Sequence, residues 1–223
     1  MCGYAAVMAP SSPPRPSPSG LTVLALLTAG PLHPYGMQRL IKSWGKDKVV
    51  NVGQRANLYK TIARLHEAGL IAVRQTERSQ QYPERTVYEL TEEGRATGLR
   101  WLVGMLATPR EEYPAFPAAL SLAMILGPAE VAAALAQRLT AVQARLAELD
   151  AELRDNGPVL PRIVLIETEY QRAVTETEAN WLTTVIGELT SGALTWSWEQ
   201  LAPYAAPGIA QAGISPDTAP HGD

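Results

Sequence analysis

The chain has 223 residues, of which 46% are hydrophobic, and a formal net charge of -3, values that suit a globular protein of one or two domains. No run of about 18 apolar residues occurs, so a membrane-spanning helix is not expected, and the N-terminus lacks the positive charge of a secretory signal. The single cysteine, Cys2, excludes an internal disulfide framework and favours a cytoplasmic location.

The charge is unevenly distributed along the chain. Residues 1–100 contain 13 Lys and Arg against 7 Asp and Glu, a net charge of +6, whereas residues 101–223 contain 6 against 15, a net charge of -9. A basic first half suits a polyanionic partner, and an acidic second half suits a solvated domain held away from that partner.

Both ends of the chain are predicted to be flexible tails. Residues 1–20 contain the run PSSPPRPSPSG, and residues 202–223 are rich in Pro, Gly and Ala. Segments of this composition cannot fill a core. The tails therefore frame two expected domains, residues 21–107 and residues 118–201.

The first domain is predicted to open with two short helices. An apolar helix spans Leu21–Ala29 and ends at Gly30-Pro31, and a second helix spans Tyr35–Lys42. Pro34 fits the first turn of the second helix, where its missing N–H costs nothing. We expect His33 to order the intervening turn by hydrogen bonding.

The third predicted helix, from Gln54 to Ala68, is amphipathic. Leu58, Ile62 and Leu65 share one face, and Gly69 ends the helix. The opposite face is polar, basic and low in bulk, as in a helix that enters a DNA major groove.

A two-stranded ribbon is expected next. Strands over residues 71–76 and 86–90 flank a polar tip, Glu77–Glu84. Thr91 is a suitable N-cap for a helix that runs to Leu106. The apolar positions of that helix are Leu99, Leu102, Val103 and Leu106, with Trp101 close by. A helix followed by such a ribbon is the outline of a winged helix-turn-helix.

The second half is predicted to be helical after a Pro-rich break at residues 108–117. A short helix spans Ala118–Leu126, two long helices span Pro128–Asp155 and Arg162–Leu189, and a short segment spans Ala193–Leu201.

The two long helices carry apolar seams. The first seam is Ala132, Leu135, Leu139, Val142, Leu146, Leu149 and Leu153, an unbroken heptad pattern. The second is Ile163, Ile166, Tyr170, Val174, Thr177, Trp181, Val185 and Leu189. Because one small domain needs less apolar surface, we predict a coiled-coil-like homodimer through Leu135, Leu139, Val142, Leu146, Leu149 and Leu153. An intramolecular helical hairpin uses the same residues, and the two arrangements are compatible.

Three sequence runs resemble the DNA-binding domain of PadR-type transcriptional regulators. They are LTVLALLTAGPLHPYGMQRLI, NLYKTIARLHEAGLI and RTVYELTEEGR, within about residues 20–100. Pro34 stands where the family usually has Gly, and Thr61-Ile62 replaces a small or apolar pair. The resemblance implies a mainly α fold with a small β-wing: a winged helix-turn-helix followed by a helical dimerisation domain.

The function expected from this resemblance is that of a homodimeric repressor, bound to a two-fold related operator in double-stranded DNA and released by a small aromatic effector. The residues expected to contact DNA are Lys46, Lys48, Gln54, Arg55, Asn57, Tyr59, Lys60, Arg64, Arg78, Gln80, Gln81 and Arg85. Trp101 and Trp181 are candidates for an effector pocket. Three scattered histidines predict no metal site, and no cofactor is expected.

The sequence disfavours three alternative functions. An enzyme is disfavoured because the sequence has no G-x-S-x-G, no phosphate loop with Lys, no dinucleotide fingerprint and no H-E-x-x-H. A regulator similar to the MarR type would place dimerisation helices on both sides of the winged helix, whereas a Pro-rich segment precedes it here. A winged-helix adaptor that binds protein instead of DNA is disfavoured by the basic face of residues 54–68.

Overall fold

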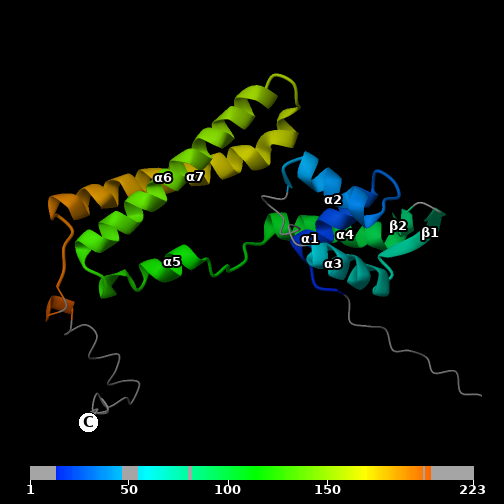
Figure 1. Ribbon diagram of the computed structural model, residues 1–223, viewed down its shortest axis with the longest axis horizontal. Helices are drawn as coiled ribbons and strands as arrows, with labels where there is room; N and C mark the ends of the chain where they lie inside the picture. The colour runs from blue at the N-terminus through cyan, green and yellow to red at the C-terminus, as the bar shows by residue number, and fades with distance from the viewer. Residues whose placement is uncertain (1–13, 47–54, 80–81, 198, 202–223) are drawn as a thin grey trace, which may run out of the picture. The chain divides into compact units, whose positions relative to one another are not determined.

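The computed structural model describes residues 14–46, 55–79, 82–197 and 199–201 (Figure 1). The chain divides into two compact units, Met1–Glu111 and Glu112–Asp223. Each unit has a hydrophobic core of its own. No helix in the described residues is both long enough and apolar enough to cross a membrane.

The described residues of the first unit form four α-helices and one hairpin: α1 (Pro18–Leu27), α2 (Pro34–Ser43), α3 (Arg55–Glu67), β1 (Ile71–Ser79), β2 (Tyr82–Leu90) and α4 (Glu92–Ala107). Its core gathers side chains from all four helices and the start of β1, and every helix predicted for this region is present. The fully buried members include Val23, Leu24, Met37, Ile41, Leu58, Ile62 and Ile71.

Helix α1 begins at Pro18, three residues before the predicted start, so the segment predicted as a flexible tail contributes to the fold. The reason is local. The Ser17 hydroxyl accepts a hydrogen bond from the Gly20 N–H at 3.1 Å, and proline is favourable in the first turn. Residues 1–13 and 202–223 lie outside the described residues.

Side chains also cap α2 and α4 at their N-termini. His33 Nδ1 accepts a hydrogen bond from the Gly36 N–H at 2.7 Å, which confirms the predicted role of this histidine in the turn. Thr91 Oγ1 accepts from the Gly94 N–H at 3.0 Å and donates to the Gly69 carbonyl at 2.8 Å. Thr91 is therefore the predicted N-cap, and it also ties the start of α4 to the end of α3.

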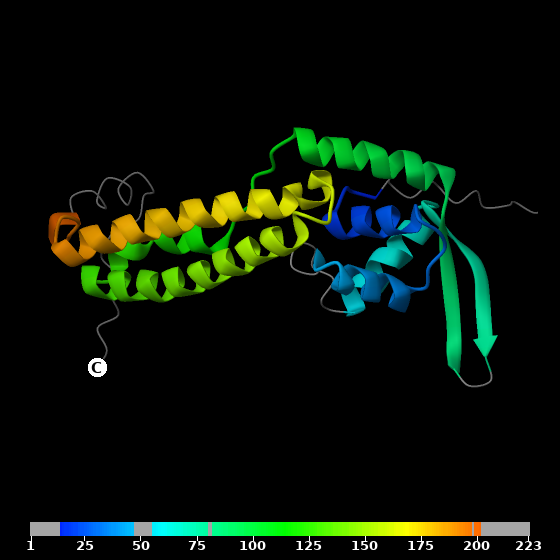
Figure 2. The same ribbon diagram turned by 90° about the horizontal axis from the view of Figure 1, so that it is seen from above.

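The hairpin is longer than predicted. Strands β1 and β2 pair antiparallel from Ile71 opposite Leu90 out to Ser79 opposite Tyr82 (Figure 2). The predicted tip, Glu77–Glu84, is therefore mostly strand. A further bridge joins β2 to the loop before α2, because Leu32 and Tyr88 exchange two backbone hydrogen bonds of 3.0 and 2.9 Å.

The inward face of α4 differs from the predicted one. Gly94, Thr97, Gly98 and Trp101 face the core. The expected apolar positions are exposed instead: Leu99, Leu102, Val103 and Leu106. Small residues on the inner face let α4 lie close to its neighbours, and a Cβ at Gly98 would stand 3.5 Å from Leu24.

The second unit consists of α5 (Ala115–Leu120), the 3-10 helix η2 (Ala123–Ile125), α6 (Pro128–Asn156) and α7 (Arg162–Ser191). Helices α6 and α7 form a long antiparallel hairpin (Figure 2). The single short helix predicted for residues 118–126 is wrong, since α5 starts earlier and a separate 3-10 turn follows it. Trp196, beyond α7, donates its indole N–H to the Leu126 carbonyl at 3.0 Å.

The α6 seam packs on α7 of the same chain, so the intramolecular hairpin is the arrangement found. The predicted α7 seam is largely uncovered. Its exposed members are Ile163, Ile166, Tyr170, Val174 and Trp181. The covered side of α7 is lined instead by Leu165, Thr168, Ala179, Leu182 and Leu189.

Candidate nucleic-acid interface

Helix α3 separates a buried apolar face from an exposed polar one. Leu58, Ile62 and Leu65 are at most 2% exposed and fix the helix to the core. On the other side, Lys60 and Arg64 are exposed one turn apart, with only the small Ala63 between them at the surface. A rigid, low-bulk helix surface of this kind can approach the edges of base pairs closely.

Two of the cations on α3, Lys60 and Arg64, are exposed. Neither Lys60 nor Arg64 forms an ion pair with any described residue. Tyr59 is 55% exposed on one flank. Asn57 is half-buried on the other, and its carbonyl accepts a hydrogen bond from Thr61 Oγ1 at 2.8 Å. Lys60 and Arg64 are therefore the exposed Lys and Arg side chains of this helix within the described residues.

In the wing, which is the β1–β2 hairpin, one positive charge near the base is partly neutralised by a carboxylate. Arg74 on β1 lies 3.6 Å from Glu89 on β2, and both side chains are about half exposed. Farther out, Arg85 pairs with Glu77 across the hairpin in backbone register.

Several predicted contact residues lie beyond what the structure describes. Lys48, Gln54, Gln80 and Gln81 fall outside the described residues, as do the side chains of Arg55, Arg78 and Arg85. Lys46 is described and lies half-buried after α2.

Two exposed cations on α2 were missed by the sequence reasoning. Arg39 and Lys42 lie on the side opposite the buried Met37 and Ile41. Their spacing of one helical turn, away from the apolar positions, was the available signal. In helix-turn-helix proteins the first helix of the pair crosses the DNA backbone, so these cations are candidates for phosphate contacts.

The two candidate effector tryptophans belong to different units. Trp101 lines a pocket in the first unit with Arg64 and Leu65. Trp181 lines an apolar pocket of about 510 Å³ in the second unit with Leu135 and Trp196. Its ring meets that of Phe116 edge-on, with 6.2 Å between the centroids.

Metal chemistry has no support in the part of the chain that is described, because no group of three or more His, Cys, Asp or Glu side chains gathers there.

The first unit contains a segment that matches a known protein family. Residues 23–98 match the family described as the transcriptional regulator PadR-like family. These residues belong to the PadR-like family of transcriptional regulators. The PadR-like segment begins within α1 and ends within α4, so it includes the exposed face of α3 and the wing. The family is one of regulators, not of enzymes.

Solved structures extend the likeness beyond the PadR-like segment. Bacillus subtilis PadR in complex with operator DNA is 17% identical, with a TM-score of 0.62 over 76% of this chain and 98% of that chain. The PadR-like regulator BC1756 from Bacillus cereus is 17% identical, with a TM-score of 0.55 over 78% and 99%. The virulence activator AphA of Vibrio cholerae is 15% identical, with a TM-score of 0.57 over 78% and 98%. At these identities the likeness establishes the fold. No curated protein matches the chain in sequence.

Proposed function

We propose that this protein is a sequence-specific DNA-binding regulator of transcription that acts as a homodimer in the cytoplasm. The observation that carries the proposal is the exposed face of α3. There, Lys60 and Arg64 lie without ion-pair partners among the described residues, on a helix whose other face is fixed in the core of a PadR-like domain.

Affinity and specificity for DNA come from two kinds of contact. Phosphate contacts from Lys and Arg supply most of the affinity and release counterions, so binding weakens as salt rises. Base-edge contacts supply the specificity, and an Arg can bond guanine in a bidentate manner. We assign Lys60, Arg64 and Asn57 to the groove, and Arg39 and Lys42 to the backbone.

Dimerisation is supported by apolar surface that no described residue covers. Tyr170 is 70% exposed and Val174 is 50% exposed, and both lie on one stripe of α7. A second copy covering this stripe would bury it and would place two α3 helices on a two-fold related site. Recognition helices in successive major grooves are about 34–36 Å apart. Because the α6 seam already packs on α7, we assign the interface to the outer face of α7.

We further propose that the regulator represses transcription and that a small molecule releases it. The support is the effector-bound neighbour. Bacillus subtilis PadR has been solved in complex with p-coumaric acid, and that structure is 16% identical to this chain with a TM-score of 0.59. A ligand can release DNA only if it prefers the state that does not bind DNA.

Fluorescence anisotropy with a labelled duplex from the promoter of the protein's own gene tests DNA binding. Lys60→Ala and Arg64→Ala should each weaken binding by about 1–3 kcal/mol if they read bases, or lower the salt slope by about 1 if they contact phosphate. Arg154→Ala removes an exposed cation from α6 in the second unit and serves as the control. Binding that all three variants leave unchanged would refute the assignment of the α3 face.

A further inference from the structure

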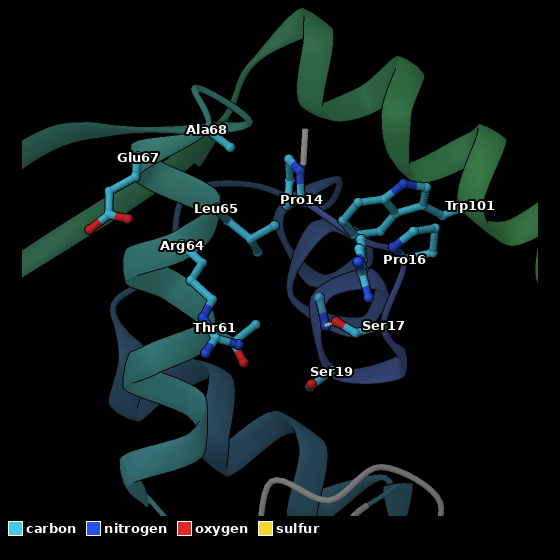
Figure 3. Close-up of a pocket in the computed structure, with 12 residues that line it drawn as sticks. Pro14, Pro16, Ser17, Ser19, Thr61, Arg64, Leu65, Glu67, Ala68 and Trp101 are labelled. Carbon is cyan, nitrogen blue, oxygen red and sulfur yellow. Dashed lines mark hydrogen bonds between the residues drawn. The ribbon is translucent and has the colours of Figure 1, made fainter. Parts of the chain in front are cut away.

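A pocket of about 480 Å³ in the first unit lies between α3 and the segment that leads into α1 (Figure 3). Thr61 and Arg64 line it from α3, and most of residues 14–20 line it from the opposite side. The match to the PadR-like family begins at residue 23, so the shared family pattern does not include this second side.

Residues 14–19 are fixed beside α3 although three of them are prolines. The Ser17 hydroxyl accepts a hydrogen bond from the Gly20 N–H at 3.1 Å, and the Ser17 carbonyl accepts one from the Leu21 N–H at 2.9 Å. A Cβ at Gly20 would stand 3.0 Å from the indole of Trp101, which packs on the start of α1. A segment that is already ordered and proline-stiffened loses little conformational entropy when it binds a partner.

An arginine lines the pocket from each side. Arg15 and Arg64 are both exposed, and neither forms an ion pair with a described residue. Ser17 and Ser19 add hydroxyl groups that can donate to an anion. Glu67 is the one carboxylate among the described lining residues, so the lining charge is +1. That charge suits a phosphodiester, because each backbone phosphate of DNA carries one negative charge.

The pocket adjoins the face of α3 that we assign to the DNA groove. Arg64 belongs to both, since it is exposed one turn after Lys60 and also lines the pocket. A helix that enters a major groove is oriented by contacts to the phosphates that border the groove, and an N-terminal arm can supply contacts beyond the helix. Arg15, across the pocket from Arg64, is therefore placed to meet a bordering strand.

We propose that residues 14–19 form an N-terminal arm of the DNA interface, in which Arg15 holds a backbone phosphate beside the groove that Lys60 and Arg64 enter. This inference rests on the proposed function and adds a contact outside the family-matched segment. Because a phosphate contact carries no sequence information, the arm should add the same salt-dependent affinity on every DNA sequence.

Fluorescence anisotropy of the full chain tests the arm, with the promoter duplex and a scrambled duplex of equal length, between about 50 and 200 mM salt. Arg15→Gln should weaken binding to both duplexes by the same factor, about three- to tenfold, and lower the salt slope by about 1. Arg15→Lys keeps the point charge and should restore most of the affinity and the slope. Arg95→Gln, an exposed position on α4 that does not line the pocket, should change neither.

Three results would overturn the arm while the proposed function stands, provided that Lys60→Ala and Arg64→Ala still weaken promoter binding. The first is an Arg15→Gln variant with unaltered affinity and salt slope. The second is a loss of affinity that Arg15→Lys does not restore, which would indicate a structural role. The third is a loss confined to the promoter duplex, which would indicate base reading. If the unaltered protein binds neither duplex, the proposed function fails and the arm fails with it.

Discussion

Gly94 has almost no room for a side chain. A Cβ at this position would collide with the carbonyl oxygen of Leu70, at the junction between α3 and the wing. The same residue donates its N–H to the Thr91 cap. Gly94 therefore sets how closely the start of α4 can approach that junction.

Gly94→Ala should lower the free energy of unfolding of the first unit by about 1–3 kcal/mol, the usual cost of overpacking. Gly104→Ala is the matched control, because it lies on the same helix and a Cβ there meets nothing within 4 Å. That change should stabilise the unit by up to about 1 kcal/mol through helix propensity. Urea unfolding followed by circular dichroism measures both, and equal effects would contradict the packing argument.

The residues facing outward on α3 could be predicted, because Leu58, Ile62 and Leu65 mark the buried face by their spacing. The pocket beside Trp101 could not be predicted in the same way. Several residues that line it, between Pro14 and Gly20, belong to a Pro-rich run that has no periodicity. The capping bond at Ser17, the hydrogen bond from the Leu21 N–H to the Ser17 carbonyl and the approach of the indole to Gly20 fix the described end of that run.

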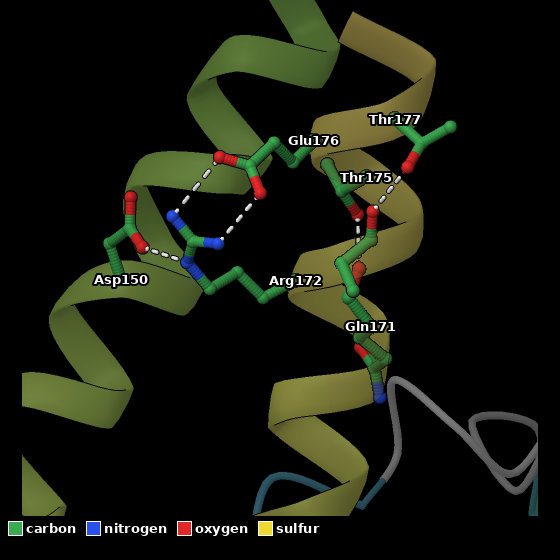
Figure 4. A network of polar contacts seen from close by, with 7 residues as sticks. Asp150, Gln171, Arg172, Thr175, Glu176 and Thr177 are labelled. Carbon is green, nitrogen blue, oxygen red and sulfur yellow. Dashed lines mark hydrogen bonds and ion pairs between the residues drawn. The ribbon is translucent and has the colours of Figure 1, made fainter.

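At the scale of elements, polar pairs hold the α6–α7 hairpin in register. Arg172 on α7 donates to Asp150 on α6 at 2.6 Å and to Glu176 at 2.9 Å (Figure 4). Three further contacts cross between the helices: Arg138 with Glu178, Arg145 with Gln171, and Thr168 with Glu152. Several side chains must lose partners together if one helix slides along the other, so these contacts favour a single register.

Apolar spacing predicted that α6 and α7 are helices but not which side of α7 is covered. Thr168 is 4% exposed and lies on the covered side, whereas Tyr170 is 70% exposed. A covered Thr is tolerated because its hydroxyl donates to Glu152 at 3.1 Å. Pattern analysis ranks Tyr above Thr as a core residue and has no access to such cross-helix partners. The buried face of α4 differs from the predicted one for a related reason, since two of its buried residues, Gly94 and Gly98, carry no apolar side chain that a pattern could detect.

A double-mutant cycle on Arg172→Met and Asp150→Asn should give a coupling energy of about 0.2–1 kcal/mol, the usual value for partly exposed ion pairs. Thermal unfolding of the four proteins measures it. Arg95→Met removes an exposed arginine of α4, in the first unit, that has no ion pair among the described residues and should show no coupling to Asp150→Asn. A coupling of zero for Arg172 as well would mean that packing alone sets the register.

At the scale of the whole molecule, the two halves of the chain differ in net charge and in exposed apolar surface. Residues 1–100 carry a net +6 and residues 101–223 a net -9. The basic half contains the PadR-like segment, and the acidic half contains a hairpin with an uncovered apolar stripe. Under the proposed function, the first unit meets DNA, while the second pairs two chains and is repelled by the phosphates.

Tyr170→Asp with Val174→Asp should convert the proposed dimer into folded monomers, because two charges on the outer stripe of α7 would have to be desolvated at the interface. Sedimentation equilibrium measures the assembly, and circular dichroism checks that the helices remain. Thr183→Asp, an exposed position of α7 away from the stripe, should stay dimeric. Leu149→Asp should instead unfold the hairpin, since Leu149 is 1% exposed within it. If the double variant still forms a stable dimer, the interface does not include this stripe.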